Sequence, residues 1–401
     1  MAVVLCISSY YKGYDFMQAS KALGNEVYLV TSESLRDAHW PWESLDDVFY
    51  MHEVQPYKWN MMHLIEGIAH FMRSKTVDIV VALDDFDVEK AAEVREVFRI
   101  PGMGQTTHRY FRDKLAMRQM AEDNKIQVPA FTAVFNDEAV RQFTKEVSGP
   151  WVLKPRSEAS ATGIKKIYTE QELWQQLQNL GTERYKYLIE QFKPGYVYHV
   201  DSLIHNGKVI FAVASRYVLP PMTVVQEGGV FMSQTLSNRD RTTRALLRMN
   251  KDLIKKFGLV NGTTHSEFIQ CKETGEFYFL ETASRVGGAF LADMVEVASG
   301  INLWKEWAAI ENAVFHNTDY QLPEHENNFA GLLVSLSKVE TPDLSYVTDD
   351  EFAKQVFKDY HVGMIFLADK KEKIDKMLEK HSVEVREKFL SIIPPKEYPT
   401  S

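Results

Sequence analysis

Glu267 and Glu281 have the residue type and the spacing of a metal-binding pair. Each lies in an apolar, strand-like stretch, and a polar run with a glycine, residues 272–276, separates the two stretches. This pattern predicts a β-hairpin, and a turn centred on Thr274 places the two carboxylates directly opposite each other on one face. Like charges in that position repel, and a hard divalent cation such as Mg²⁺ removes the penalty. The alternative is that both are solvated surface glutamates.

Residues beside the hairpin favour a site for a metal and an anion. Arg285, Gly287 and Gly288 follow the second glutamate closely, and they supply a fixed positive charge beside backbone that a ligand can approach. His265 precedes Glu267 by two residues, so the two side chains share a strand face. His265 can contact a substrate, orient a metal ligand, or serve as a structural histidine.

A second group of residues, upstream of the hairpin, could bind a nucleotide. Lys154 ends the apolar stretch 151–153, and a lysine there must face an anion or lose its charge. The loop that follows, 157–163, consists mainly of small and hydroxyl residues, whose backbone N–H groups can bind phosphate. Further on, the strand pattern 187–190 runs into Phe192, where a strand edge offers backbone groups and an apolar wall to an adenine ring.

The composition is that of an ordinary globular protein. The 401 residues, of which 25% are charged and 45% hydrophobic, suffice for two or three domains. A net charge of −9 argues against a general nucleic-acid binder. Cys6 and Cys271 lie in apolar strand patterns, and we predict that both are buried thiols. No basic leader and no apolar run of membrane-spanning length occur, so we expect a cytoplasmic protein without membrane contacts.

The organisation of the chain predicts a mixed α/β and α+β fold. The first hundred residues alternate apolar strands with helical patterns, which is typical of a parallel sheet with helices on both faces. A Rossmann dinucleotide site needs a glycine-rich turn after the first strand, and Ser8 and Ser9 stand there instead. No Walker A loop occurs either. The sequence therefore argues against both of these nucleotide-binding motifs. After Gly195 the strands become antiparallel, with a hairpin signal at Asn206 and Gly207. The predicted segments are a Rossmann-like domain 1–105, a linker helix and central lid subdomain 106–195, an antiparallel-sheet subdomain with the metal site 196–325, and an α/β extension 326–401.

The order of these features resembles the ATP-grasp superfamily over about residues 1–320. The motifs that carry the resemblance are, in chain order, Arg-Asp-Lys-Leu at 112–115, Val-Leu-Lys-Pro at 152–155, Ile-Glu-Gln-Phe at 189–192, and Glu267 with Leu-Glu-Thr-Ala-Ser-Arg at 280–285. No single motif is specific, but their order and spacing together are. The resemblance implies an ATP-grasp fold. Within the superfamily, the chain is most similar to the carboxylate–amine ligases that include bacterial L-amino-acid ligases.

Position by position, the resemblance assigns roles to the residues described above. It implies that ATP and Mg²⁺ are the cofactors, with Mn²⁺ as an alternative metal. The set it implies is Lys114 and Lys154 for the phosphates, Glu190, Gln191 and Phe192 for the adenine, Glu267 and Glu281 for the metal, and Arg285, together with Lys154, for the reacting carboxylate or acyl phosphate.

Two positions depart from the pattern of the superfamily. An asparagine often stands two residues after the second metal glutamate, and Ala283 takes its place here, so a second metal ion would lose a ligand. The usual ribose-binding glutamate would fall near Val197, and we expect His199 or Asp201, on the same strand face, to replace it. The candidate substrate contacts, for which surface or structural roles are the alternatives, are Arg216, His265, Arg285 and Asp84.

The activity that the resemblance implies is ATP-dependent ligation of a carboxylate to an amine through an acyl phosphate, with release of ADP and phosphate. One alternative is a biotin-carboxylase-like subunit that activates bicarbonate, although the attachment pattern Ala-Met-Lys-Met is absent from the sequence. Another is a nucleotide-binding regulator without turnover, which Ala283 makes plausible, although Arg285 and both glutamates argue against it. The expected partners are small-molecule carboxylate and amine substrates, neither nucleic acid nor membrane, and a homodimer is left open.

Overall fold

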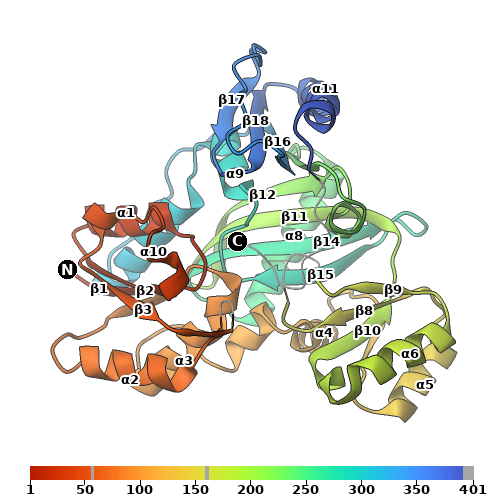
Figure 1. Ribbon diagram of the computed structural model, residues 1–401, viewed down its shortest axis with the longest axis horizontal. Coiled ribbons are helices and arrows are strands. Elements are labelled where there is room, and N and C mark those ends of the chain that lie inside the picture. Colours follow the sequence, from red (N-terminus) through yellow and green to blue (C-terminus); the bar gives the residue numbers. More distant parts are fainter. Residues whose placement is uncertain (56–57, 159–161, 392–401) are drawn as a thin grey trace.

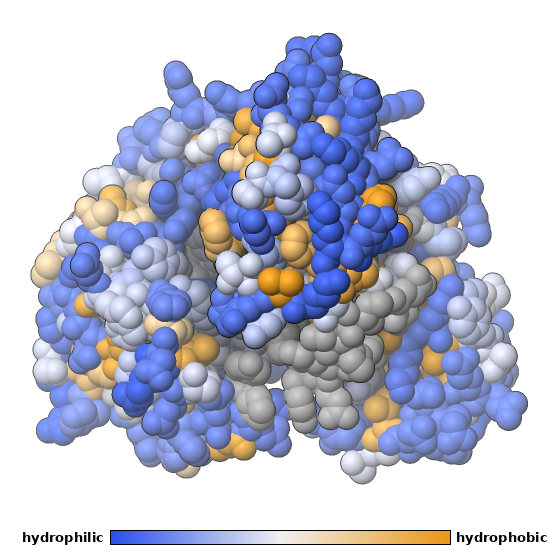
Figure 2. Space-filling model, turned by 45° about the horizontal axis from the view of Figure 1, so that its top comes forward, coloured by the Kyte–Doolittle hydropathy of each residue, from blue (hydrophilic) through white to orange (hydrophobic). Residues whose placement is uncertain are grey.

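The computed structural model describes residues 1–55, 58–158 and 162–391. Within them the strands form four sheets, and Figure 1 shows the N-terminal sheet and a smaller sheet on opposite sides of a large one. The face in Figure 2 is mostly hydrophilic, with small and separate hydrophobic patches. None of the helices in this part of the chain is long and apolar enough to cross a membrane. The cytoplasmic location and the homodimer stay predictions.

The N-terminal sheet is parallel, with the strand order β3-β2-β1-β6, which confirms the predicted Rossmann-like arrangement. One face packs on α2 and α3, and the other packs on α1 and on α10, which comes from far along the chain. Because both faces are covered, its central strands are almost entirely buried. The elements are β1 (Val3–Ser8), α1 (Tyr14–Ala22), β2 (Glu26–Ser32), β3 (Asp47–Met51), a ribbon of β4 (Glu53–Gln55) and β5 (Lys58–Trp59), α2 (Met61–Phe71), β6 (Ile79–Ala82), α3 (Val88–Phe98) and α10 (Leu303–His316).

The central subdomain is a four-stranded antiparallel sheet of order β7-β10-β8-β9, covered by α5 and α6. Helix α4 precedes it. Arg156, directly after β8, pairs with Asp113, the N-cap of α4, so the end of β8 is attached to the start of that helix. The elements are α4 (Lys114–Asp123), β7 (Phe131–Ala133), α5 (Asp137–Glu146), β8 (Trp151–Pro155), β9 (Lys165–Ile167), α6 (Glu170–Leu180) and β10 (Tyr187–Gln191).

The large sheet has eight strands, all antiparallel to their neighbours, in the order β15-β14-β11-β12-β13-β16-β18-β17. Its last three strands come from the predicted extension 326–401, which therefore continues this sheet within the described residues. Helix α8 packs on one face, and α9 packs on the opposite face near β13, β16 and β18. The elements are β11 (Gly195–His205), β12 (Lys208–Tyr217), α7 (Pro221–Glu227), β13 (Phe231–Thr235), α8 (Arg241–Phe257), β14 (Gly262–Cys271), β15 (Phe277–Ala283), α9 (Leu291–Ser299), β16 (Phe329–Leu336), β17 (Phe352–Val356), β18 (His361–Ala368) and α11 (Lys371–Lys388).

The glutamate hairpin forms with the predicted pairing, because Glu267 and Glu281 are partners in the β14–β15 register. The register of the two strands is not that of a regular hairpin, however. Nearer the turn, Phe268 pairs with Phe279, so Leu280 is the extra residue of a bulge beside the glutamates. A bulge shifts the register by one residue and re-aims the side chains beside it. It therefore compensates for a turn that lies slightly before the predicted centre.

Cys6 and Cys271 are both free and buried, as predicted. Each lies in a strand, in β1 and at the end of β14 respectively. They are far apart in the fold, in different sheets, so the two thiols do not form a disulfide.

Candidate active site

A cavity of about 1310 Å³ lies between the N-terminal sheet, the central subdomain and the large sheet. This volume exceeds that of a pocket for one small ligand, about 300–1,000 Å³, so a nucleotide and further reactants fit together. The predicted site residues that line it are Asp84, Lys114, Lys154, Glu190, Gln191, Phe192, His265, Glu267, Glu281 and Arg285. His199, Asp201 and Arg216 are not among the lining residues. Of the predicted phosphate loop 157–163, residues 159–161 lie outside the described residues.

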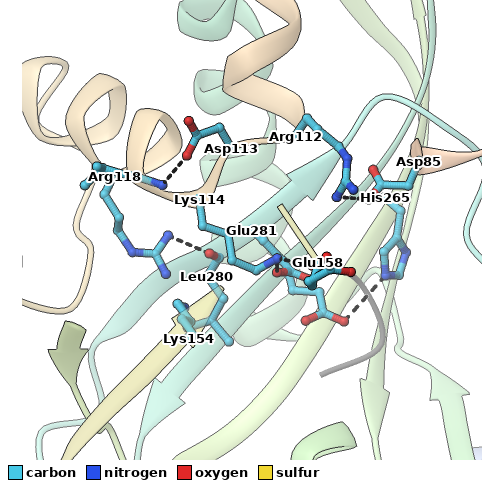
Figure 3. Close-up of polar contacts among 12 residues, drawn as sticks. Asp85, Arg112, Asp113, Lys114, Arg118, Lys154, Glu158, His265, Leu280 and Glu281 are labelled. Atoms are coloured by element: carbon cyan, nitrogen blue, oxygen red, sulfur yellow. Dashed lines mark hydrogen bonds and ion pairs between the residues drawn. The ribbon is translucent and has the colours of Figure 1, made fainter. Parts of the chain in front are cut away.

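Lys114 is held at the start of α4, pointing at the metal candidate Glu281 (Figure 3). Asp113 caps the helix by accepting hydrogen bonds from the first free amides, which fixes where Lys114 begins the helix. Its Nζ lies 2.9 Å from Glu281 Oε2 and donates a 2.7 Å hydrogen bond to the Glu158 carbonyl. Burial would raise the pKa of Glu281, but the Lys114 cation outweighs burial and lowers the pKa to about 2. The carboxylate is therefore ionised at neutral pH.

Lys154 belongs to a buried group of three charges. Its Nζ pairs with one oxygen of Glu190, and the other oxygen accepts from Arg118 Nε at 3.0 Å and Nη2 at 2.8 Å. Burial lowers the pKa of Lys154 to about 8, and the attraction of Glu190 offsets this only in part. Both oxygens of Glu190 are thus occupied by cations. We therefore revise the prediction that Glu190 contacts adenine, and we expect it instead to position Lys154.

Arg118 is a site residue that the sequence reasoning missed. It is fully buried on α4, and besides Glu190 it binds the Leu280 carbonyl, next to the metal candidate on β15. The available signal was its position four residues after Lys114, which places both side chains on one helix face. Nothing local indicated its partner, because Glu190 is 72 residues away.

The two glutamates on the cavity floor each have a partner of their own. Glu267 Oε1 accepts a 2.8 Å hydrogen bond from the Tyr217 hydroxyl and lies 3.6 Å from His265 Nε2, while Glu281 pairs with Lys114. The repulsion expected from the hairpin alone is therefore offset within the protein. Two carboxylates from neighbouring strands, side by side in a cavity, are the donor set that a hard divalent cation prefers. The residues present thus fit Mg²⁺.

His265 is held by a buried network on the same face of the sheet. Asp201 Oδ1 lies 2.8 Å from His265 Nδ1, and Asp201 Oδ2 lies 2.7 Å from His199 Nδ1, whose other ring nitrogen is 2.7 Å from Ser233 Oγ. Burial would lower the pKa of His265, but Asp201 outweighs burial and raises the pKa to about 9.

The same network corrects the predicted ribose contacts. His199 and Asp201 have no exposed surface, and their polar atoms are occupied by each other, by His265 and by Ser233. Neither side chain can reach a ribose, so that prediction was wrong. The ligand atoms of His199, Asp201 and His265 lie within 4.8 Å of one another, as in a metal site. Each carboxylate oxygen already accepts a hydrogen bond from a ring nitrogen, and we therefore interpret the cluster as a hydrogen-bond network.

Arg285 and Asp84 meet in the cavity from opposite domains. Asp84 follows β6, pairs with Lys12 and accepts a 3.1 Å hydrogen bond from the Phe86 amide. Burial would raise its pKa, but Lys12 and, to a smaller extent, Arg285 lower it. Arg285 donates a 2.9 Å hydrogen bond to the Val286 carbonyl, and its charge faces Asp84. An amine at Asp84 would share the carboxylate with Lys12, so this contact stays a prediction.

Two further predictions change in detail. Arg216 lies on the face of β12 opposite to the cavity, next to the ring of Tyr196, because its neighbour Tyr217 takes the inward position. The expectation that Arg216 binds substrate was therefore wrong, and Tyr217 is the site residue of that pair. At the hinge, the Phe192 amide donates to the Pro150 carbonyl at 3.0 Å. Any backbone contact with adenine must thus use groups next to that amide.

Comparisons with known proteins agree with this architecture. Residues 147–293 match the ATP-grasp domain family. The chain is 25% identical over 235 residues to the L-arginine-specific L-amino acid ligase of Bacillus subtilis, a match that covers 57% of this chain and 56% of that protein. The chain thus matches only about half the length of this curated relative.

Solved structures extend the likeness of fold to the whole chain. An L-amino acid ligase from Bacillus licheniformis superposes with a TM-score of 0.76 at 16% identity, over 100% of this chain and 99% of that one. The biotin carboxylase domain dimer of the Hydrogenobacter thermophilus 2-oxoglutarate carboxylase, in complex with MgADP and bicarbonate, gives a TM-score of 0.69 at 14% identity, over 95% and 89% of the two chains.

In this fold a small antiparallel sheet and a large one enclose a cavity that is lined by lysines and paired carboxylates. An ATP-grasp domain occupies residues 147–293, and the complete chain has the ATP-grasp fold. The match over residues 147–293 and the fold of the complete chain agree with the resemblance found in the sequence.

Proposed function

We propose that this protein is an ATP-dependent ligase that joins a carboxylate to an amine and releases ADP and phosphate. The observation that carries the proposal is the convergence, in one cavity, of two lysines, a facing pair of glutamates and Arg285. The linker helix, the central subdomain and the large sheet each supply part of this set, which is the arrangement expected of an ATP-grasp enzyme.

The residues divide among the charges of the reactants. Lys114 and Lys154 would bind phosphate oxygens, for which charge-assisted hydrogen bonds are strong. Glu267 and Glu281 would hold Mg²⁺, and a bound Mg²⁺ would withdraw negative charge from the phosphate under attack. Arg285 would hold the substrate carboxylate and stabilise the charge that develops on it. Enclosure by the three sheets would keep water away from a reactive acyl phosphate.

The proposed reaction has two steps. An oxygen of the substrate carboxylate attacks the γ-phosphorus of ATP, the bond from that phosphorus to the bridging oxygen breaks, and ADP leaves. The amine nitrogen then attacks the carbonyl carbon of the acyl phosphate, the bond to the phosphate oxygen breaks, and the nitrogen gives up a proton to phosphate or water. Inorganic phosphate and an amide are the products.

The two organic substrates are proposed to be amino acids, which are the substrates in the names of the two Bacillus ligases. Beyond Tyr217, the lining includes the apolar side chains Phe231, Val334 and Val356 together with the polar residues Glu340, Lys358 and Asp359, and the two valines are buried. Burying apolar surface there is favourable, whereas a charged side chain would lose its hydration. The surface formed by Phe231 and the two valines therefore favours an apolar side chain.

The proposal is tested by incubating the protein with MgATP and single or paired amino acids, including leucine and arginine. ADP, AMP and phosphate are quantified, and peptides are identified by mass spectrometry. We expect ADP, phosphate and peptide in equal amounts, with loss of all three in Glu267→Gln. AMP in place of ADP would exclude the acyl phosphate. ATP hydrolysis that needs bicarbonate but no amino acid would favour a carboxylase-like subunit, and nucleotide binding without turnover would favour a regulator.

A further inference from the structure

Asp201 is an unusual carboxylate, because it is completely buried beside the proposed site and yet ionic. It lies on β11 with no exposed surface, and it does not line the cavity. Its two oxygens bind two histidines, His199 at 2.7 Å and His265 at 2.8 Å. Burying a carboxylate is costly unless its partners compensate. The two histidines therefore compensate for the burial of Asp201 beside the proposed site.

One branch of the network leads from Asp201 to the metal candidate Glu267. His265, held by Asp201, places Nε2 at 3.6 Å from Glu267 Oε1 and 3.4 Å from the Tyr217 hydroxyl. Tyr217 itself donates a 2.8 Å hydrogen bond to Glu267. The ring of His199, the second partner of Asp201, packs on Tyr217 with their centroids 4.7 Å apart. Both groups that flank Glu267 are thus fixed by the same carboxylate.

The other branch leads to the loop that carries Arg285. A Cβ atom at Gly287 would lie 2.6 Å from Asp201 Oδ1 and 3.1 Å from His265 Nδ1. The bare backbone of Gly287 therefore packs directly against the Asp201–His265 hydrogen bond. Because Gly287 is two residues after Arg285, the position of that hydrogen bond limits where the arginine loop can lie.

We propose that Asp201 is a positioning residue that sets the metal carboxylate and the substrate arginine relative to each other. It would act on Glu267 through His265 and Tyr217, and on Arg285 through contact with Gly287. This inference rests on the proposed function, in which Glu267 holds a metal and Arg285 holds a carboxylate. In a ligase, the two groups must be aligned on the same pair of reactants, and a displacement of about 1 Å can cost about a hundredfold in rate.

The Gly287 branch is tested by Gly287→Ala with two comparison variants. Gly288→Ala adds the same methyl group one residue away, where nothing lies within 4 Å, and Gly67→Ala does so on the remote helix α2. We expect Gly287→Ala to lower kcat by about ten- to a hundredfold, with KM for ATP changed less than threefold. Gly67→Ala should leave both unchanged. An equal loss in Gly288→Ala would mean that crowding of the cavity, and not contact with Asp201, causes the effect.

The Asp201 branch is tested by Asp201→Asn, His265→Gln and the double variant, with folding checked by thermal melts. Asparagine keeps the shape but can accept through only one side-chain oxygen, so one histidine loses its acceptor. We expect the gain in ADP affinity that Mg²⁺ provides to fall about tenfold in Asp201→Asn, with ADP affinity in EDTA unchanged. The double variant should lose less of this gain than the sum of the two single losses, because Asp201 acts on Glu267 in part through His265 and such residues are non-additive.

The binding measurement separates this inference from the proposed function. If the wild type binds MgADP but ligates nothing, the ligase proposal fails while the metal branch can still be measured. If the wild type ligates amino acids, and Asp201→Asn and Gly287→Ala both keep wild-type kcat and Mg²⁺ dependence, the inference is overturned. Fully additive losses of the Mg²⁺ gain in the double variant would likewise overturn it, because Asp201 would then act on Glu267 without any contribution through His265.

Discussion

Neutralising Glu281 distinguishes a metal ligand from a structural glutamate. In the structure the carboxylate lies 2.9 Å from the Lys114 ammonium, and about a third of its side chain is exposed, 35% against 8% for Lys114. Repulsion between facing carboxylates would predict that Glu281→Gln stabilises the protein. The ion pair reverses that expectation, because Lys114 would lose its charged partner and keep only the Glu158 carbonyl.

The expected loss of stability is small. A hydrogen bond to a charged group contributes about 1.5–3 kcal/mol, and solvent screening at a partly exposed pair reduces this to about 1 kcal/mol. The pKa of Glu281 is lowered from 4.5 to about 2. A lowered pKa means that the stabilisation is complete above pH 4.5 and is lost as the pH falls towards 2. At neutral pH the full difference between wild type and variant should therefore be seen.

The expected loss of ligand stabilisation is larger. Removing one charged contact to a bound ligand weakens affinity by about ten- to a hundredfold. At a ligand concentration of 100 Kd, MgATP stabilises the wild type by about 2.7 kcal/mol, and in the variant the same concentration should give about 0.4–1.4 kcal/mol.

Denaturant melts with and without MgATP measure both quantities, and Glu273→Gln in the exposed turn of the same hairpin is the matched control. The control should behave as wild type in both conditions. If Glu281→Gln lowers stability by several kcal/mol but keeps the full MgATP effect, the glutamate is structural and the metal site is refuted.

Three further predictions concern charged residues of the site. Arg118→Met should lower the free energy of unfolding by about 3–5 kcal/mol, because it leaves Glu190 with one cation; a denaturant melt within 1 kcal/mol of wild type would contradict this. Affinity for MgATP should fall as the pH rises above about 8, where Lys154 loses its proton, and calorimetry at pH 7 and 9 should show a flatter response in Lys154→Arg; equal slopes would remove Lys154 from the phosphate site. Arg285→Ala should bind MgATP normally but lose ligation, and an equal loss of both would make the arginine a phosphate ligand.

The sequence could predict those parts of the fold that depend on local patterns of apolar and polar residues. Alternating apolar strands and helices were enough for the parallel N-terminal sheet, and the polar run 272–276 was enough for the hairpin. The bulge at Leu280 could not be foreseen, because a single extra residue leaves no signal in a period-two pattern. The pairing of Glu267 with Glu281 came out correctly because bulge and turn shift the register in opposite directions.

The parts of the site that sequence missed depend on contacts between distant segments. Arg118 was missed because Glu190 is remote along the chain. Tyr217 faces the cavity in place of the predicted Arg216, because the inward face of β12 is decided by its neighbours β11 and β13 and not by its own residues. His199 and Asp201 were placed on the correct face, but that face alone does not show which positions are covered. Burial by neighbouring elements, and not residue type, decides which of these residues can contact a ligand and which only hold other residues in place.

The two lysines that we propose to bind phosphate are already paired with acids of this chain, Lys114 with Glu281 and Lys154 with Glu190. Phosphate at Lys114 would therefore compete with a carboxylate for the same cation, and a metal at Glu281 would compete with that cation for the same carboxylate. Binding both together resolves the competition, because the metal takes Glu281 and leaves Lys114 to the phosphate. Lys154 differs, since Arg118 compensates Glu190 when Lys154 turns to a phosphate. The third buried charge, Arg118, therefore keeps Glu190 paired when Lys154 binds a phosphate. The affinity for nucleotide should depend on the metal chiefly through Lys114.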